Sequence, residues 1–397
     1  MIPEEGKPGE PPLRLLHLVG DGDRSGLFTR LIEAHDRDRV RPRLATVGSC
    51  EPALREAMAR LDVPVLSLDG SPPWGGAGAV TRLVGHLRRE RIQVLNTHLY
   101  HPSVAGQAAG ALARTPIRVV TRHHSDYHLR AGRSVHVALD RFTTTLVHRV
   151  VAVSEHTRQV LIHREGAPPE KVVTVLNSVD RQRVRVALEA DPSELRRRLP
   201  VGPGELALVV PARLHPEKGH STLFRALRLL DSRRVGVAWA SLRPKYRVFL
   251  LGDGPSRKAY EEEVASLGLA GRVVFMGSRP DAVELMRAAD GVVLPSHAEA
   301  FGLVVLEALA VGAPLVATTA GGIPELVRHE ENALLVPPED EWTLARALAR
   351  VLDEPGLRER LAAAGGPKVL EPYTAERMAR EYEEVYLDAA RERGLRV

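Results

Sequence analysis

The sequence predicts an α/β protein built from two doubly wound parallel sheets, and three observations support this fold class. Short apolar runs alternate with helical patterns along most of the chain, which is typical of parallel sheets covered by helices on both faces. The alternation is clearest in residues 290–327, where the pattern is strand, loop, helix, strand, loop, helix. The length of 397 residues is enough for two domains that each bury a core.

The start of the chain and its composition indicate the cellular compartment of the protein. Residues 1–12 contain no apolar run, so they predict a disordered tail and not a signal peptide. The single cysteine, Cys50, excludes an intrachain disulfide and is consistent with a reducing, cytoplasmic compartment. Residues 302–320 are apolar enough to imitate a membrane span, but Glu307 and Pro314 fall inside them. A helix followed by a strand explains this stretch better, and we therefore expect no transmembrane segment.

Residues 13–190 are expected to form the first domain, with a linker at residues 191–204. The predicted strands of this domain cover residues 13–19, 43–47, 63–68, 94–97, 118–121, 150–153 and 172–176. Residues 71–78 predict a flexible loop at the carboxyl end of a strand, which suits a lid over a substrate.

The loop after the first strand permits more than one interpretation. Gly20, Gly22 and Gly26 imitate a dinucleotide-binding fingerprint, but the second strand ends in Gly-Ser, without the acidic residue that would hold a ribose. Asp21 and Asp23 form a D-x-D pair, which binds a metal in some enzymes but is common by chance. We interpret the pair as part of a turn.

Residues 121–136 are rich in histidine and arginine. The histidines are His123, His124, His128 and His136. A metal cluster is conceivable because histidine is the commonest metal ligand. Asp126 is the only carboxylate in the segment, however, so we expect no metal site. A basic surface loop without a function is the alternative to a role in binding.

The second domain is expected at residues 205–372, followed by a helix at residues 373–397 that carries an apolar stripe. Arg213 and Lys218 follow its first strand in an R-x4-K arrangement, and two cations in such a loop can neutralise a diphosphate. The chain has no G-x4-G-K-[ST] loop, so the sequence gives no support for nucleotide hydrolysis.

Two carboxylates mark the loop and helix within residues 290–327. Glu299 precedes the helix and Glu307 lies two turns inside it, which gives an E-x7-E spacing. The backbone amides at the helix start can bind anions or hydroxyl oxygens. The alternative for Glu307 is an ordinary helical carboxylate that points to solvent.

Residues 295–327, PSHAEAFGLVVLEALAVGAPLVATTAGGIPELV, resemble the signature of the family 4 retaining glycosyltransferases, which have the GT-B fold. The segments VVPARLHPEKGHSTLFRAL, FLLGDGP and RVVFMGSRPDAVELMRAAD resemble the same family in the same order. The resemblance implies two Rossmann-like domains facing each other across a cleft. It further implies that the first domain binds the acceptor and that the second domain binds a nucleotide-diphosphate sugar of the UDP or GDP type. The last helix would return to the first domain, and the reaction would use no cofactor or metal.

The resemblance also implies roles for individual residues. Arg213 and Lys218 would stabilise the diphosphate, Glu299 would orient the donor sugar, and Glu307 would bind the ribose. The other implied donor-binding positions are the helix-start residues Phe301, Gly302 and Leu303, Gly277 near the nucleobase, and Gly26 near the phosphates. At Gly26 the usual Gly-Gly pair is absent. His123, in the family's T-x-H pattern, would face the donor sugar, with His124 as the alternative because the doubled histidine blurs the register.

Charge is distributed unevenly between the two halves. Residues 1–200 carry 30 Lys and Arg against 22 Asp and Glu, a net +8, and residues 201–397 carry 25 against 28, a net −3. The arginines near the expected site are Arg118, Arg122, Arg130, Arg133, Arg141 and Arg149. This field predicts an anionic partner on the acceptor side, such as a lipid phosphate or an acidic glycan, and a peripheral contact with the inner membrane face. The acceptor itself is expected to be a glycan or a lipid-linked molecule. Ordinary solvated surface is the alternative, and no nucleic-acid partner is expected.

Two other functions remain open on this sequence. A nucleotide-sugar epimerase of the same architecture would consume the donor without an acceptor, and a non-catalytic subunit would only bind it. The intact E-x7-E and R-x4-K patterns favour an active transferase.

Overall fold

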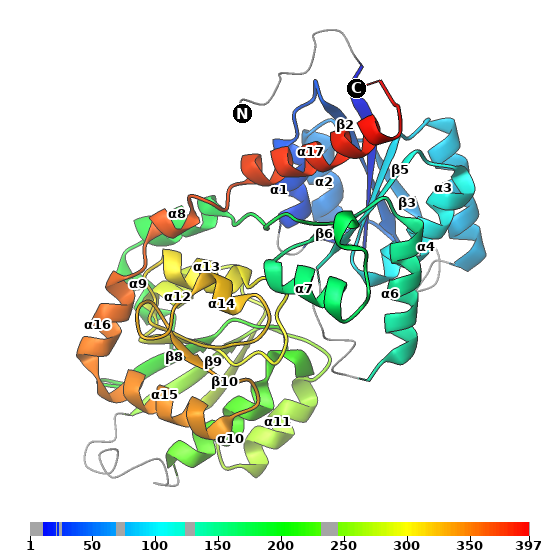
Figure 1. Cartoon of the computed structure of the whole chain (residues 1–397). Helices are drawn as coiled ribbons and strands as arrows, with labels where there is room; N and C mark the ends of the chain where they lie inside the picture. Colours follow the sequence, from blue (N-terminus) through cyan, green and yellow to red (C-terminus); the bar gives the residue numbers. More distant parts are fainter. Residues whose placement is uncertain are drawn as a thin grey trace. The chain divides into compact units, whose positions relative to one another are not determined.

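The computed structural model describes residues 11–20, 22–23, 26–68, 76–123, 132–231 and 245–396. The chain divides into two compact units, Met1–Ser178 with Tyr373–Val397, and Val179–Pro372 (Figure 1). Each unit contains one parallel sheet with helices between consecutive strands. The prediction of an α/β protein with two doubly wound sheets is therefore confirmed.

The first unit is built on a seven-stranded parallel sheet with the order β3-β2-β1-β4-β5-β6-β7. The strands are β1 (Leu13–Val19), β2 (Val40–Val47), β3 (Val65–Leu68), β4 (Val94–His98), β5 (Ile117–Arg122), β6 (Arg149–Ala152) and β7 (Val172–Thr174). Its helices are α1 (Leu27–Ala34), α2 (Pro52–Arg60), α3 (Gly76–Arg89), α4 (Tyr100–Ala113), α6 (Ser134–Leu146) and α7 (Glu155–His163). The strand order reverses between β1 and β4, which is where ligands bind in sheets of this kind.

The last helix of the chain, α17 (Ala375–Glu392), belongs to this first unit and packs beside α1 (Figure 1). Thr374 caps its N-terminus by accepting from the amide of Arg377. Its apolar face, which includes Met378, Tyr382 and Tyr386, joins a core cluster with residues of β1, β4 and β5. The helix is therefore part of the core of the unit and not a surface addition.

The second unit contains a six-stranded parallel sheet with the order β10-β9-β8-β11-β12-β13. The strands are β8 (Leu206–Val210), β9 (Tyr246–Leu251), β10 (Val273–Gly277), β11 (Gly291–Leu294), β12 (Leu315–Thr318) and β13 (Leu334–Val336). The helices are α8 (Arg181–Glu189), α9 (Pro192–Arg197), α10 (His220–Asp231), α11 (Arg257–Ser266), α12 (Ala282–Ala288), α13 (Leu303–Ala310), α14 (Ile323–Leu326), α15 (Glu341–Asp353) and α16 (Pro355–Ala363).

The boundary between the units differs from the one expected from the sequence. The sequence predicts the end of the first domain and the linker where the structure has α8 and α9, but these helices lie in the second unit. Both pack against α12, where Arg183 donates to the carbonyl of Pro280 at 3.1 Å and Arg196 donates to that of Ala288 at 3.0 Å. Their packing partners lie almost a hundred residues further along the chain, so no local pattern indicates this placement.

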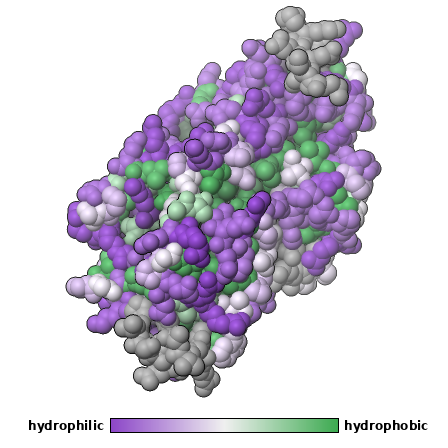
Figure 2. Space-filling view, turned by 60° about the vertical axis from the view of Figure 1, so that its left-hand side comes forward, coloured by the Kyte–Doolittle hydropathy of each residue, from purple (hydrophilic) through white to green (hydrophobic). Residues whose placement is uncertain are grey.

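Two further expectations concern the surface. The predicted lid at residues 71–78 lies largely outside the described residues, and its last residues begin α3. Among the helices of the described ranges, none has the length and apolar character needed to cross a membrane. In the view of Figure 2, hydrophilic residues cover most of the described surface and the apolar residues form small patches between them.

Candidate functional site

Three loops of the second unit meet at the carboxyl ends of β8, β11 and β12. The loop after β8 carries Arg213 and Lys218, and the loop after β11 carries Glu299. Lys218 Nζ donates to Glu299 Oε2 at 2.8 Å, and both side chains are largely buried. The structure thus brings together a cation and a carboxylate that are 81 positions apart in the sequence.

The charge in this site is positive on the β8 side. Burial alone would lower the pKa of Lys218, but the carboxylates of Glu299 and Glu217 outweigh that cost and raise it, so the amine stays protonated. Arg213 lies close enough to oppose this rise. Within the described part of the chain, its guanidinium forms no ion pair. The loop therefore holds one paired cation and one whose charge is available to an anion.

Close backbone contacts fix the relative positions of the β8 and β11 loops. The amide of His297 donates to the carbonyl of Glu217 at 2.7 Å, and Thr222 Oγ1 lies 2.9 Å from His297 Nε2. Gly219 has a φ of +69°, and a Cβ there would lie 2.8 Å from the backbone carbonyl carbon of Pro295. Only glycine satisfies both the left-handed conformation and this close approach.

The glycine pair after β12 holds Glu299 in the same way. The amide of Gly322 donates to the carbonyl of Glu299 at 3.1 Å. Gly321 has a φ of +56°, and a Cβ there would lie 2.6 Å from the carbonyl carbon of Glu299. The position of the Glu299 backbone therefore depends on a residue without a side chain at position 321.

Helix α13 begins at the same end of the sheet. Gly302 is its N-cap with a φ of 102°, Phe301 before it is buried, and Leu303 is its first residue. The first amides of a helix have no acceptor within the helix, so those of Gly302 and Leu303 face the region ahead of α13. Gly302 and Leu303 therefore place amide donors at the same edge of the sheet as Lys218 and Glu299.

Glu307 does not have the solvent-exposed environment of an ordinary helical carboxylate. Its side chain is only 14% exposed, and its Oε1 lies 3.8 Å from Arg183 Nη1 of α8. Arg183 was not identified from the sequence, because nothing near it resembles a motif. Gly277, the other predicted position in this unit, ends β10 with a φ of +69° and forms an isolated bridge with Gly252.

His123 and Gly26, the two donor-binding residues predicted in the first unit, are both associated with helix α1. His123 follows β5, and its ring lies 5.6 Å from that of Phe28 in α1, the helix that begins at the N-cap Gly26. Burial lowers the pKa of His123 to about 4. The alternative residue, His124, lies outside the described residues.

Asp23 has a structural role at the start of α1. Its Oδ2 accepts from the amide of Thr29 at 2.7 Å, as expected for a carboxylate that caps a helix. Asp21 lies outside the described residues. In the described part of the chain, no three His, Cys, Asp or Glu side chains are arranged so that they could hold a metal ion together.

The expected field of free arginines on the first unit is weaker than the sequence indicates. Arg122 is buried, pairs with Asp140 and donates to the carbonyl of that residue at 2.7 Å. Arg118 donates to two backbone carbonyls, and Arg149 pairs with Glu392. Three of the six arginines expected near the site are therefore paired or hydrogen-bonded inside the unit.

Comparison with known proteins identifies the family. The model of Glycosyltransferase Family 4 matches residues 27–183, and that of the Glycosyl transferases group 1 matches residues 191–366. The two matches follow each other and together span both units. The chain belongs to the family 4 glycosyltransferases. The family that the sequence resemblance implies is thereby confirmed, and the protein is a glycosyltransferase.

Relatives of this glycosyltransferase act on different compounds, according to their names. It is 27% identical over 323 residues to an N-acetyl-alpha-D-glucosaminyl L-malate synthase of Bacillus anthracis, which covers 81% of each chain. It is 37% identical over 221 residues to a D-inositol 3-phosphate glycosyltransferase of Actinosynnema mirum, which covers 54% of this chain and 51% of that protein.

Solved structures confirm the GT-B fold of this glycosyltransferase. The Anabaena protein Alr3699/HepE in complex with UDP-glucose matches 95% of this chain and all of its own, with a TM-score of 0.78 and 23% identity. Sucrose-phosphate synthase from Thermosynechococcus elongatus matches 96% of this chain and all of its own, with a TM-score of 0.75 and 19% identity.

Proposed function

We propose that this glycosyltransferase transfers a sugar, with retention of configuration, from a nucleotide-diphosphate sugar to a hydroxyl group of an acceptor. The observation that carries the proposal is the Lys218–Glu299 pair beside the available charge of Arg213. A diphosphate needs cations, and a sugar needs hydrogen-bond acceptors directly next to them. The solved complex of Alr3699/HepE with UDP-glucose supports a donor of the UDP type, and a GDP-sugar is the other candidate.

Each group of the donor has a partner in this proposal. Arg213 and Lys218 stabilise the negative charge that develops on the diphosphate as the glycosidic bond breaks. An ammonium group has three donors, so Lys218 can contact a phosphate oxygen while it still holds Glu299. Glu299 and the amides of Gly302 and Leu303 orient the sugar hydroxyls.

The remaining positions bind the two ends of the donor. Glu307 accepts hydrogen bonds from the ribose hydroxyls, and the backbone at Gly277 borders the nucleobase. In the first unit, His123 faces the donor sugar and Gly26 approaches the phosphates.

The reaction is a substitution on one face of the sugar. The bond between the anomeric carbon and the phosphate oxygen breaks, and the acceptor oxygen forms its bond to that carbon on the same face. The leaving phosphate takes the proton of the acceptor hydroxyl. Glu299 is a positioning residue in this scheme: Lys218 holds its carboxylate, which orients the sugar and forms no covalent bond to the anomeric carbon. Since Arg213 and Lys218 supply the positive charge, the reaction requires no divalent metal and no cofactor.

The acceptor binds to the first unit and is a glycan, a lipid-linked sugar or a small molecule. Arg122 and Arg149 form ion pairs inside the unit and Arg118 donates to backbone carbonyls there, so these arginines offer less charge to an anionic bilayer. We therefore favour an acceptor in solution. Co-sedimentation with vesicles, with and without anionic lipid and at low and high salt, tests the alternative. Binding that requires anionic lipid and disappears at high salt would instead favour a peripheral membrane contact.

The function is tested by incubating the protein with a panel of nucleotide sugars and candidate acceptors. We expect release of the nucleoside diphosphate that depends on an acceptor, and a product with the anomeric configuration of the donor. Consumption of the donor without an acceptor would identify an epimerase, and binding without turnover would identify a non-catalytic subunit. Either result, or an inverted product, would overturn the proposal.

A further inference from the structure

A chain of hydrogen-bonded histidines runs through the interior of the first unit and ends at His123. His98 Nδ1 lies 3.1 Å from His123 Nε2, and His98 Nε2 lies 3.0 Å from His17 Nδ1. His17 Nε2 lies 3.2 Å from His35 Nε2, and His35 Nδ1 lies 2.9 Å from Glu383 Oε1. The chain therefore links a carboxylate of the last helix to the residue that we assign to the donor sugar.

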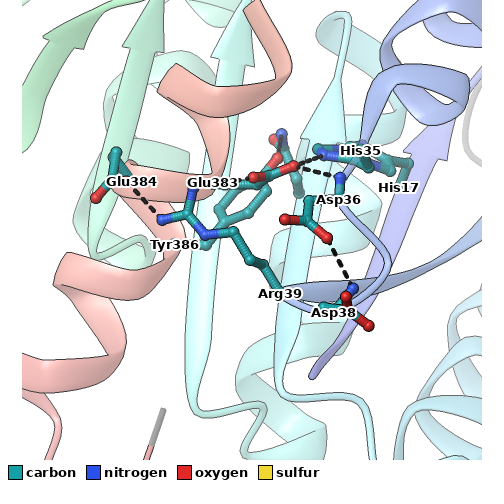
Figure 3. Close-up of polar contacts among 9 residues, drawn as sticks. His17, His35, Asp36, Asp38, Arg39, Glu383, Glu384 and Tyr386 are labelled. Atoms are coloured by element: carbon teal, nitrogen blue, oxygen red, sulfur yellow. Dashed lines mark hydrogen bonds and ion pairs between the residues drawn. The ribbon is translucent and has the colours of Figure 1, made fainter. Parts of the chain in front are cut away.

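Neighbouring elements of the fold place these rings next to each other. His17 lies in β1, His98 ends β4 and His123 follows β5, and these strands are adjacent in the sheet. Consecutive ring centroids are 5.2–5.4 Å apart along the whole chain. His35 follows α1, and Glu383 comes from α17 (Figure 3).

Burial keeps each of these histidines neutral. His17, His35 and His98 are almost completely buried. Burial lowers the pKa of every ring in the chain, and it does so for His17 and His98 to well below the ordinary value. A neutral imidazole has one N–H donor and one acceptor nitrogen. A ring that donates to one neighbour must therefore accept from the other, so the tautomer of one ring fixes that of the next.

Glu383 determines that direction. Its Oε1 accepts from His35 and from the backbone amide of Asp36 at 2.9 Å, and its Oε2 accepts from Arg39 at 3.2 Å (Figure 3). A carboxylate with these donors is an acceptor, so the proton of His35 is on Nδ1 and its Nε2 has the lone pair.

The remaining tautomers follow in turn. His17 donates from Nε2 to His35, His98 donates from Nε2 to His17, and His123 donates from Nε2 to His98. The other nitrogen of His123, Nδ1, carries the lone pair and has no partner among the described residues.

We propose that Glu383 locks the tautomer of His123 through His35, His17 and His98, so that Nδ1 of His123 is a permanent hydrogen-bond acceptor for a sugar hydroxyl. The inference rests on the proposed function in one respect, namely the assignment of His123 to the donor sugar. Glu383 and the three intervening histidines are positioning residues. Reversing one ring would place two donors or two acceptors against each other in the interior, where unsatisfied polar groups are costly.

The lock is tested directly by NMR of protein labelled with ¹⁵N-histidine, since two-bond correlations distinguish the two neutral tautomers. In the wild type we expect His123 to be protonated only on Nε2. Glu383→Gln replaces the carboxylate by a group that both donates and accepts, and His17→Phe interrupts the chain and leaves Glu383 in place. Both variants should show a mixture of tautomers at His123.

The control is Glu384→Gln, because Glu384 also pairs with Arg39 but is about half exposed. Among the described residues it forms no hydrogen bond or ion pair with a histidine of the chain. The control should leave the tautomer and the activity unchanged. For Glu383→Gln and His17→Phe we expect kcat/KM to fall about 10–100-fold, as when a partner that orients a functional histidine is removed. Thermal unfolding identifies a variant that does not fold, and the other variant then carries the test.

A His123 that is protonated on Nδ1 in the wild type, or that keeps one tautomer in both variants, would overturn the lock. The variant His123→Phe separates this outcome from failure of the proposed function. If His123→Phe transfers sugar normally while NMR shows a single tautomer that depends on Glu383, the lock is supported and the assignment of His123 to the donor is overturned.

Discussion

The substitution Gly321→Ala tests whether turnover depends on the position of Glu299. Gly321 has a φ of +56°, and an added Cβ would lie 2.6 Å from the carbonyl carbon of Glu299 and closer still to its oxygen. Carbon atoms in contact are separated by about 3.5–4.0 Å. The methyl group must therefore displace the Glu299 backbone by about 1 Å, and the hydrogen bond from Gly322 with it.

The size of the effect follows from this displacement. A misplacement of about 1 Å at a positioning residue can lower the rate about 100-fold, which corresponds to about 2.7 kcal/mol in the activation free energy. A left-handed conformation of a residue with a side chain costs a further ~1–2 kcal/mol in the free energy of unfolding. The displacement acts on both catalysis and stability, and the left-handed conformation acts on stability alone.

Gly268→Ala separates the two effects. Gly268 lies in the same unit with a φ of +70°, and an added Cβ there meets nothing within 4 Å. Gly268→Ala should lose only the cost of the left-handed conformation in thermal unfolding, and Gly321→Ala should lose more because its Cβ also displaces backbone. Only Gly321→Ala should lose about 100-fold in kcat/KM for transfer. Transfer by Gly321→Ala within about twofold of Gly268→Ala would show that the position of Glu299 does not limit the reaction.

Three further predictions concern binding, metal and pH. Glu307→Gln should mainly raise the KM for the donor, and Glu299→Gln should also lower kcat by roughly 10–1000-fold, measured by steady-state kinetics; wild-type values in both would contradict the site. Activity should survive EDTA, and loss of activity that Mg²⁺ restores would instead indicate a metal ion in the site. Asp23→Ala should cost about 1 kcal/mol in the free energy of unfolding, because it removes the carboxylate that accepts from the amide of Thr29 at the start of α1. Thermal stability should fall as the pH falls from about 6.5 to about 4, because in this range histidines of the unfolded chain gain protons, whereas His123 and His148, with pKa values of about 4, stay neutral in the folded protein. The pKa of His148 is lowered first by burial and second by Arg118, and His148→Gln should reduce the dependence of the melting temperature on pH.

The sequence predicts the second unit and its site well because one rule connects them. Residues that follow neighbouring strands of a parallel sheet meet at one edge, however far apart they are in the chain. Lys218 and Glu299 are therefore expected to lie close together from the strand assignments alone, and they lie 2.8 Å apart. The glycines at positions 321 and 322 are similarly predictable as a turn, although the contact with Glu299 that requires them is not.

Other features have no local signal. The histidines at positions 17, 35 and 98 appear as isolated residues in apolar or polar stretches, and only the pairing of β1, β4 and β5 brings them to His123. Arg122 reads as part of a basic loop but is buried against Asp140, 18 positions away. In both cases, a count of charges or histidines gives no information about which side chains point into the core.

The position of Glu383 in the last helix has a consequence for how the first unit is completed. The chain leaves this unit after Ser178 and returns at Tyr373, so α17 can join the core only after the whole second unit has been synthesised. Until then the apolar residues of β1, β4 and β5 lack the partners that α17 supplies, and Asn96 lacks its hydrogen bond to the hydroxyl of Tyr386 at 2.7 Å. His35 also lacks its carboxylate during this period, so the direction of the histidine chain is undefined. Helix α17 therefore supplies both the missing part of the core and the charge that orients His123, which joins completion of the fold to completion of the site.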